Sequence, residues 1–104
     1  MYSPIFLRTE HELNKALKKQ RRGRTDLGIL FTSLWDDQSK ALIKEICEKL
    51  PRRSSTPLYI VDSFKMPHAF IIFNTSKLPH LIQFKRGVLQ SEDYLSKVYE
   101  ELGL

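Results

Sequence analysis

The sequence predicts a single α/β domain spanning residues 1–104, with a mixed sheet flanked by helices. Short apolar runs of strand length, such as Leu27–Phe31 and Ala69–Phe73, alternate with stretches whose apolar residues recur at helical spacing, such as Leu42–Leu50. A chain of 104 residues has room for one hydrophobic core and no second domain. The hydrophobic share of 41% and the charged share of 28% are those of a globular protein, which excludes a disordered chain.

The first half of the chain is predicted to form two strand–helix units. A strand at Ile5–Arg8 precedes Thr9, which with Glu12 three residues later forms a capping box for the first helix. The continuously apolar run Leu27–Phe31 is typical of a strand that is covered on both faces. The helix that follows it ends before Pro51, because proline cannot continue a helix.

The second half is predicted to contain three strands and a helix. Leu58–Val61 reads as the third strand, and the runs Ala69–Phe73 and His80–Phe84 are close enough to pair as an antiparallel hairpin. The polar segment Asn74–Pro79 is the expected turn between them. Ser91 is expected to cap the final helix.

The stretch from Phe31 to Lys40 reads Phe-Thr-Ser-Leu-Trp-Asp-Asp-Gln-Ser-Lys. It resembles the active-site segment of thioredoxins, in which a strand ends in Phe, a Trp precedes Cys-x-x-Cys and a Lys follows. Trp35 and Lys40 are kept here, but Asp36 and Ser39 stand at the two cysteine positions. The resemblance covers nearly the whole chain and implies a thioredoxin-like fold.

The resemblance also implies a groove that binds a partner. The segment Met66-Pro67-His68 looks like the cis-proline segment of the family, whose backbone pairs with an extended peptide. The segment Phe84–Gly87 lies where the family has a glycine-containing loop beside that groove. The groove residues expected on this basis are Trp35, Asp36, Ser39, Met66, Pro67, His68 and Arg86. Since few residues separate the third strand from Pro67, the helix that thioredoxins carry there is expected to be shortened or missing.

The residues needed for thiol–disulfide exchange are absent from these positions. The reaction requires a nucleophilic thiolate and a resolving thiol, which Asp36 and Ser39 cannot supply. The buried carboxylate and the nearby lysine of the family correspond to Leu30 and Leu58. The single cysteine, Cys47, falls on the apolar stripe of the second helix and is expected to pack in the core. We therefore predict that the chain is not a thiol–disulfide oxidoreductase.

No other catalytic site is expected from the sequence. Asp36, Asp37 and Ser39 could act as acid, base or nucleophile, but capping of the second helix is favoured, since carboxylates and hydroxyls at a helix start accept free N–H groups. His11, His68 and His80 are too dispersed to suggest a metal site, and no cofactor is expected. No apolar run reaches the roughly 20 residues of a membrane span. The N-terminus does not read as a signal peptide, so the expected location is cytoplasmic or otherwise intracellular, with no membrane partner.

The net charge of +5 is unevenly distributed. In the expected topology two loops bring a set of cations to the end of the sheet opposite Trp35, with Lys77 in the turn beside them. This expected basic patch comprises Lys18, Lys19, Arg21, Arg22, Arg24, Arg52 and Arg53. Arg86, in contrast, is expected at the same end as Trp35.

Two functions fit these observations. The first is a non-catalytic protein-binding or assembly module that is a subunit of a larger complex. The alternative is a nucleic-acid-associated protein that binds phosphates through its basic patch. A protein partner is favoured, because no aromatic residue is interleaved with the cations to stack on bases. A solvated surface is the plain interpretation of the patch. Redox chemistry by Cys47 with a partner thiol is the weakest hypothesis, and the sequence does not predict the oligomeric state.

Overall fold

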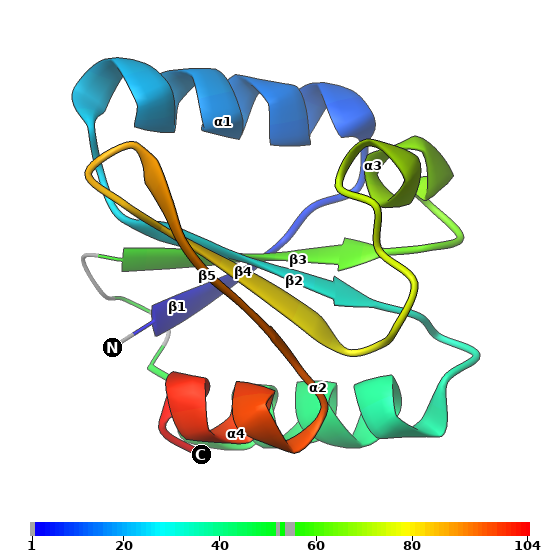
Figure 1. The fold of residues 1–104 in the computed structure, drawn as a ribbon. Coiled ribbons are helices and arrows are strands. Elements are labelled where there is room, and N and C mark those ends of the chain that lie inside the picture. The colour runs from blue at the N-terminus through cyan, green and yellow to red at the C-terminus, as the bar shows by residue number, and fades with distance from the viewer. Residues whose placement is uncertain (1, 52, 54–55) are drawn as a thin grey trace.

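The computed structural model describes residues 2–51, 53 and 56–104. Strands and helices alternate along most of the chain (Figure 1). The elements, in chain order, are β1 (Tyr2–Phe6), α1 (Glu10–Gly23), β2 (Leu27–Thr32), α2 (Asp37–Lys49), β3 (Thr56–Asp62), α3 (Pro67–Ile72), β4 (His80–Lys85), β5 (Val88–Tyr94) and α4 (Ser96–Leu102).

The five strands form one mixed sheet in the order β1-β3-β2-β4-β5. The first three strands in this order are parallel, while β4 runs antiparallel to β2 and β5 runs antiparallel to β4. Helices α1 and α3 cover one face of the sheet, and α2 and α4 cover the other (Figure 1). The predicted mixed sheet flanked by helices is therefore confirmed.

Strand β2 lies at the centre of the sheet and is buried at every residue. Because successive side chains of a strand point to opposite faces, this one strand serves two cores. Ile29 and Phe31 pack in the cluster with Leu13 of α1 and with α3, whereas Leu30 packs with Leu42 of α2 and with α4. Its continuous apolar run follows from this double coverage.

The run Ala69–Phe73 does not form the predicted strand. It belongs largely to the six-residue helix α3, which begins at Pro67. Proline fits the first turn of a helix, where its missing N–H has no intrahelical partner in any case. A short apolar run cannot be assigned to strand or helix by periodicity alone, which explains the error. The helix that was expected to be shortened or missing is thus present in short form.

The strand that pairs with β4 in a hairpin is β5, in a region where the sequence predicted the start of the last helix. Ser91 lies opposite Gln83 in this hairpin and does not cap a helix. The acidic residues after Ser91, Glu92 and Asp93, are typical of a first helical turn, but charged residues also occur in edge strands, and β5 is an edge strand of the sheet. Helix α4 begins later, at Ser96. In the described ranges no helix has the length and apolar character needed to cross a membrane.

Candidate partner-binding site

The loop between β2 and α2 presents Trp35 to solvent. The Trp35 N–H donates to Ser33 Oγ at 3.2 Å, and the Asp36 N–H donates to the Ser33 carbonyl oxygen at 3.1 Å. These two bonds close a tight turn directly after the central strand. The Trp35 side chain is 82% exposed, so the turn places a large amphipathic ring on the surface.

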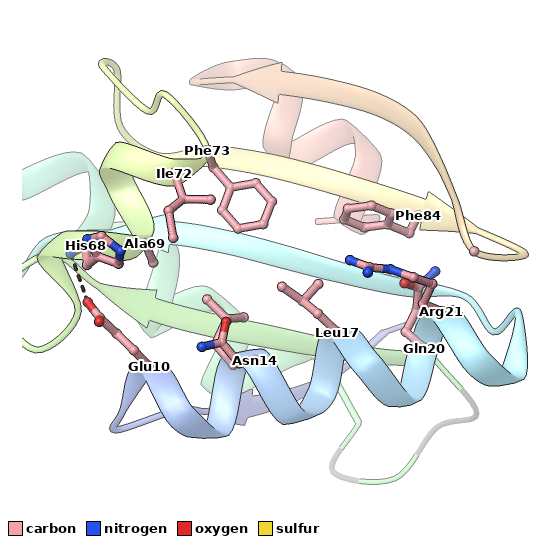
Figure 2. Close-up of a pocket in the computed structure, with 12 residues that line it drawn as sticks. Glu10, Asn14, Leu17, Gln20, Arg21, His68, Ala69, Ile72, Phe73 and Phe84 are labelled. Carbon is pink, nitrogen blue, oxygen red and sulfur yellow. Dashed lines mark hydrogen bonds between the residues drawn. The ribbon is translucent and has the colours of Figure 1, made fainter.

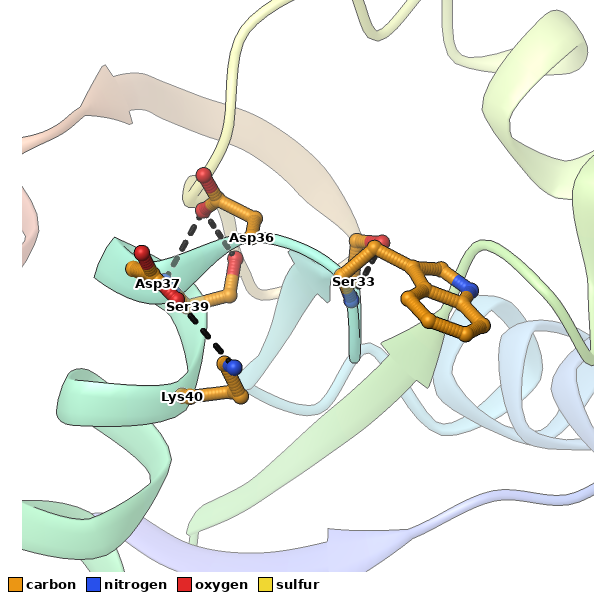
Figure 3. A network of polar contacts seen from close by, with 6 residues as sticks. Ser33, Asp36, Asp37, Ser39 and Lys40 are labelled. Atoms are coloured by element: carbon orange, nitrogen blue, oxygen red, sulfur yellow. Dashed lines mark hydrogen bonds and ion pairs between the residues drawn. The ribbon is translucent and has the colours of Figure 1, made fainter.

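Asp36 and Ser39 bind each other at the start of α2 (Figure 3). Asp36 is the N-cap, and its Oδ2 accepts the Ser39 N–H at 2.9 Å and the Ser39 hydroxyl at 2.7 Å. Ser39 is fully buried, so this carboxylate is its polar partner in the interior. Next to them, exposed Asp37 pairs with Lys40 at 3.1 Å. Asp36 is confirmed as the helix cap, whereas Ser39 is the residue that it caps, and the pair has no thiol to exchange.

Asp62, the last residue of β3, ties a second loop to the Trp35 loop. Its Oδ1 accepts the Leu34 N–H at 2.9 Å, and its Oδ2 accepts the N–H groups of Phe64 and Lys65 at 3.0 and 3.3 Å. The sequence analysis missed this residue. The available signal was an Asp directly after a strand, since Asp accepts backbone N–H groups a few residues on and so favours a turn.

Three apolar side chains are exposed on the loops that Asp62 joins. Leu34 is 52% exposed, Phe64 is 74% exposed, and Trp35 stands beside Leu34. Since one carboxylate binds the backbone of both Leu34 and Phe64, the two loops are close together. Single exposed apolar residues are ordinary, whereas a group of them on adjacent loops is a candidate interaction surface. We call Leu34, Trp35 and Phe64 the Trp35 patch.

The cis peptide bond of the described chain is Leu78–Pro79, so the assignment of a cis-proline to Pro67 is wrong. Since His80 lies opposite Phe31 in the β2–β4 ladder, Pro79 lies at the end of the sheet where β2 ends. It lines a hollow of about 560 Å³ together with Asp37 and Gln38 of α2 and Tyr99 of α4. Pro79 therefore adjoins the start of α2, as the family's proline is expected to do.

Of the other predicted groove residues, three lie away from that hollow. Met66 is fully buried as the N-cap of α3, and Pro67 begins that helix. The His68 N–H donates to Glu10 Oε1 of α1 at 2.9 Å, on the α1 side of α3. The sequence placed them at the groove because it took Pro67 for the cis-proline.

Arg86 lies at the opposite end of the sheet from Trp35, which corrects its predicted place. It sits in the turn between β4 and β5, and its N–H donates to Asp26 Oδ1 at 2.9 Å, just before β2 begins. The error arose from the strand assignment, because the expected hairpin with Ala69–Phe73 gave β4 the reverse of its true direction. Lys77 is misplaced for the same reason, since it lies two residues before Pro79.

The basic end of the molecule, where β2 and β3 begin, holds the rest of the expected patch. Lys18, Lys19, Arg21 and Arg22 lie on the last turns of α1, and Arg24 is its C-cap. Arg53 is exposed shortly before β3, and Arg52 lies outside the described residues. Arg86 joins this end, so the basic surface extends to the β4–β5 turn.

The positions that correspond to the buried carboxylate and the lysine of the family are apolar. Leu30 and Leu58 are fully buried in the core beneath α2 and α4. Cys47 is exposed on α2, so its predicted core packing is wrong. It lies at the margin of the helical stripe, whose centre is the fully buried pair Leu42 and Ile46. In the described part of the chain, no three or more metal-ligating side chains are grouped.

His80, which the sequence did not single out, is fully buried at the start of β4. Its ring stacks on Tyr94 at 4.3 Å and on Phe31 at 5.6 Å between centroids. Its Nδ1 lies 3.0 Å from Thr75 Oγ1, and its Nε2 lies 3.4 Å from Glu92 Oε1. Burial lowers the pKa of His80 below 6.5, against the opposing effect of the Glu92 and Asp93 carboxylates. Burial thus favours the neutral form of the imidazole.

Comparison with solved structures identifies the class of protein first. Thioredoxin O1 from Arabidopsis thaliana superposes with a TM-score of 0.83 at 20% identity, covering 97% of this chain and 93% of that chain. A Schistosoma mansoni thioredoxin gives 0.74 at 21% identity, with 97% and 94% covered. These likenesses, with the strand order and the cis-proline before β4, define a thioredoxin fold.

The family follows from a relative with a higher sequence identity. Thioredoxin O2 from Arabidopsis thaliana is 31% identical, with a TM-score of 0.74 and coverage of 96% of this chain and 94% of that chain. The chain therefore belongs to the thioredoxin family. A scan against protein-family models and a search of curated proteins give no match.

Proposed function

We propose that this thioredoxin-family chain is a non-catalytic protein-binding module, acts as a subunit of a larger intracellular complex and contacts its partner through the Trp35 patch. The observation that carries the proposal is the pairing of Asp36 with Ser39. The two positions that need thiols for exchange hold a carboxylate and a hydroxyl that satisfy each other. Beside them, the patch keeps three exposed apolar side chains on loops held by Asp62.

The proposed absence of thiol–disulfide exchange activity is tested separately. We expect the purified protein not to accelerate reduction of insulin disulfides by dithiothreitol, and Cys47→Ser to behave in the same way. Activity in the natural protein that is lost in C47S would overturn the non-catalytic proposal, because the exposed Cys47 thiol would then be the nucleophile.

The double variant Asp36→Cys, Ser39→Cys tests whether the backbone of the exchange site is retained. The side-chain oxygens of the two residues are only 2.7 Å apart, so two thiols in their places are expected to form a disulfide under mild oxidation. Thiol titration would then fall from three groups to one, that of Cys47. D36C alone is the control. As a monomer it should keep two titratable thiols, the introduced one at position 36 and that of Cys47.

The binding surface is tested by recovery of the tagged protein from its native cells with its partners, before and after nuclease treatment. We expect a stoichiometric protein partner that survives nuclease and is lost with Trp35→Ala. Val88→Ala is the matched control, because Val88 is also a large exposed apolar residue, 67% exposed, but lies on β5 at the basic end. Equal loss in both variants would contradict a role for the Trp35 patch.

Nucleic-acid binding is the second candidate, favoured by the position of Arg86 beside the cations of α1. Phosphate contacts release counterions, so affinity for an oligonucleotide would fall steeply between 50 and 200 mM salt. Arg21→Ala with Arg22→Ala would weaken that binding, whereas W35A would not. Partners that disappear with nuclease would favour this function over the protein-binding module.

A further inference from the structure

Three arginines from three separate segments surround one hollow at the basic end. Arg21 comes from the last turn of α1, Arg24 from the α1–β2 loop and Arg86 from the β4–β5 turn. Together with Gly87 and Val88 they line a space of about 510 Å³. We call these three residues the arginine cluster. Their convergence depends on the fold, because Arg86 is more than sixty positions from the others in the sequence.

The backbone around the arginine cluster is held in a defined shape. Arg24 and Arg86 both have left-handed conformations, with φ of 49° and 52°. The Arg24 N–H donates to the Gln20 carbonyl oxygen, and the Arg86 N–H donates to Asp26 Oδ1. The turn also packs closely on the loop, since a Cβ added at Gly87 would lie 3.5 Å from the Arg24 Cα.

The three guanidinium groups form no ion pair with any of the described residues. Among the described residues, ion pairs involve other cations, and none reaches Arg21, Arg24 or Arg86. Asp26, a carboxylate at this end of the sheet, accepts the backbone N–H of Arg86 in the turn. A guanidinium presents a planar set of donors that matches phosphate and carboxylate oxygens. Three unpaired groups around one hollow therefore favour a compact anion.

An apolar groove continues from this hollow along the α1–α3 face of the molecule (Figure 2). It has a volume of about 430 Å³, within the range of small-molecule sites. Its apolar lining comes from α1, α3, β4 and the residue after α3, and comprises Leu13, Leu17, Ala69, Ile72, Phe73 and Phe84. Arg21 and Gly87 line both the groove and the hollow, so the two spaces adjoin.

The groove is electrically polarised along its length. Glu10 lines it at the end where α1 begins, and its carboxylate accepts the His68 N–H at 2.9 Å (Figure 2). Arg21 lines it at the end where α1 finishes. A ligand with one anionic end would therefore bind with that end at the arginine cluster and its apolar body along Leu17 and Phe84.

We propose that this groove binds a small amphiphilic anion, an aliphatic phosphate monoester. The ligand is a single dissolved molecule and not part of a micelle or membrane. The phosphate occupies the hollow of the arginine cluster, and the aliphatic chain lies in the apolar groove. None of these lining residues belongs to the Trp35 patch, so the site is independent of the proposed protein-binding surface.

The experiment is titration calorimetry with decyl phosphate below the concentration at which it forms micelles. We expect saturable one-to-one binding, at least tenfold tighter than that of inorganic phosphate or of decyltrimethylammonium. Arg21→Gln with Arg86→Gln should weaken it at least tenfold. The matched control is Arg22→Gln with Lys85→Gln, which removes the same charge from neighbouring positions that do not line the hollow.

The apolar part of the site is tested by a second matched pair. Ile72→Asp places a carboxylate in the groove, whereas Ile71→Asp places it on the adjacent residue, which does not line the groove. Ile72 is 61% exposed and Ile71 is 75% exposed, so both variants should fold. We expect I72D to weaken decyl phosphate binding at least tenfold and I71D to leave it unchanged.

Several outcomes would overturn the proposal. One is that monomeric decyl phosphate does not bind, and another is that it binds no more tightly than inorganic phosphate. A third is that R21Q/R86Q and R22Q/K85Q lose equal affinity for decyl phosphate. Binding to phosphatidic acid vesicles or to an oligonucleotide but not to monomeric decyl phosphate would also overturn it. W35A should bind decyl phosphate normally, so failure of this site and failure of the protein-binding module are distinguishable.

Discussion

The two ends of the sheet use charged side chains in different ways. At the end where β2 and β3 finish, Asp36 and Asp62 accept backbone N–H groups and leave Leu34, Trp35 and Phe64 exposed. At the basic end, Arg21 and Arg86 have no ion-pair partner among the described residues, and the adjoining groove is lined by apolar side chains.

This difference distinguishes charged side chains that stabilise the fold from charged side chains that remain available to bind a ligand. A carboxylate that accepts several backbone N–H groups fixes loop geometry, and its removal leaves those donors without a partner. An unpaired surface guanidinium fixes nothing and is free to bind a ligand. Mutations at the first end should therefore change stability, and mutations at the second should change binding.

The largest stability effect is expected for Asp62→Ala. The variant loses three backbone hydrogen bonds to a charged group and releases the β3–α3 loop from the Trp35 loop. We expect the free energy of unfolding to fall by about 2–3 kcal/mol, since hydrogen bonds to charged groups are the stronger ones. Urea unfolding followed by circular dichroism measures this.

Asp37→Ala is the matched control for that measurement. Asp37 is a neighbouring carboxylate, but its side chain is 96% exposed and forms an ion pair with Lys40. Exposed ion pairs contribute at most about 1 kcal/mol, so D37A should be much milder than D62A. Equal effects would mean that Asp62 has no special role in holding the two loops.

A smaller effect is expected for Asp36→Ala. It removes the N-cap of α2 and the partner of the buried Ser39 hydroxyl. Loss of an N-cap typically lowers the free energy of unfolding by about 1 kcal/mol. Asp36→Asn keeps an acceptor at the same position and should restore most of this loss in the same urea titration. A D36N variant as unstable as D36A would indicate that the carboxylate charge is essential.

The sequence contained enough information for much of the fold and less for the site. The continuous apolar run of β2 and the capping box of Thr9 and Glu12 are local signals, and both elements formed as predicted. The assignment of Ala69–Phe73 failed, because a short apolar run packs equally well as strand or helix. That one error reversed the direction inferred for β4 and moved Arg86 to the wrong end.

Trp35 and its loop could be located from the sequence because they are contiguous and follow the central strand. The role of Asp62 depends on a hydrogen bond to Leu34, which is 28 positions away and cannot be read from local pattern. The arginine cluster likewise requires the β4–β5 turn to meet the end of α1. The cis-proline was misassigned because Pro67 and Pro79 both precede apolar segments, and only the fold distinguishes them.

The lowered pKa of His80 should make the stability of the protein depend on pH. Its pKa in the folded protein lies below the 6.5 of the unfolded chain, so below about pH 6.5 the unfolded chain takes up a proton that the folded protein resists. The free energy of unfolding should therefore fall as the pH drops from 6.5 toward that lowered pKa. The slope should be smaller in His80→Gln and unchanged in His11→Gln, an exposed histidine on α1. Equal slopes in the natural protein and in H80Q would refute this assignment.

The smallest stability effect is expected for R21Q/R86Q. Because neither guanidinium is paired in the described part of the chain, its loss breaks no ion pair. The Arg86 N–H bond to Asp26 comes from the backbone and survives the substitution. We expect the free energy of unfolding to change by less than about 0.5 kcal/mol, as for most surface changes. A large loss of stability would instead make these arginines structural, and the contrast between the two ends of the sheet would disappear.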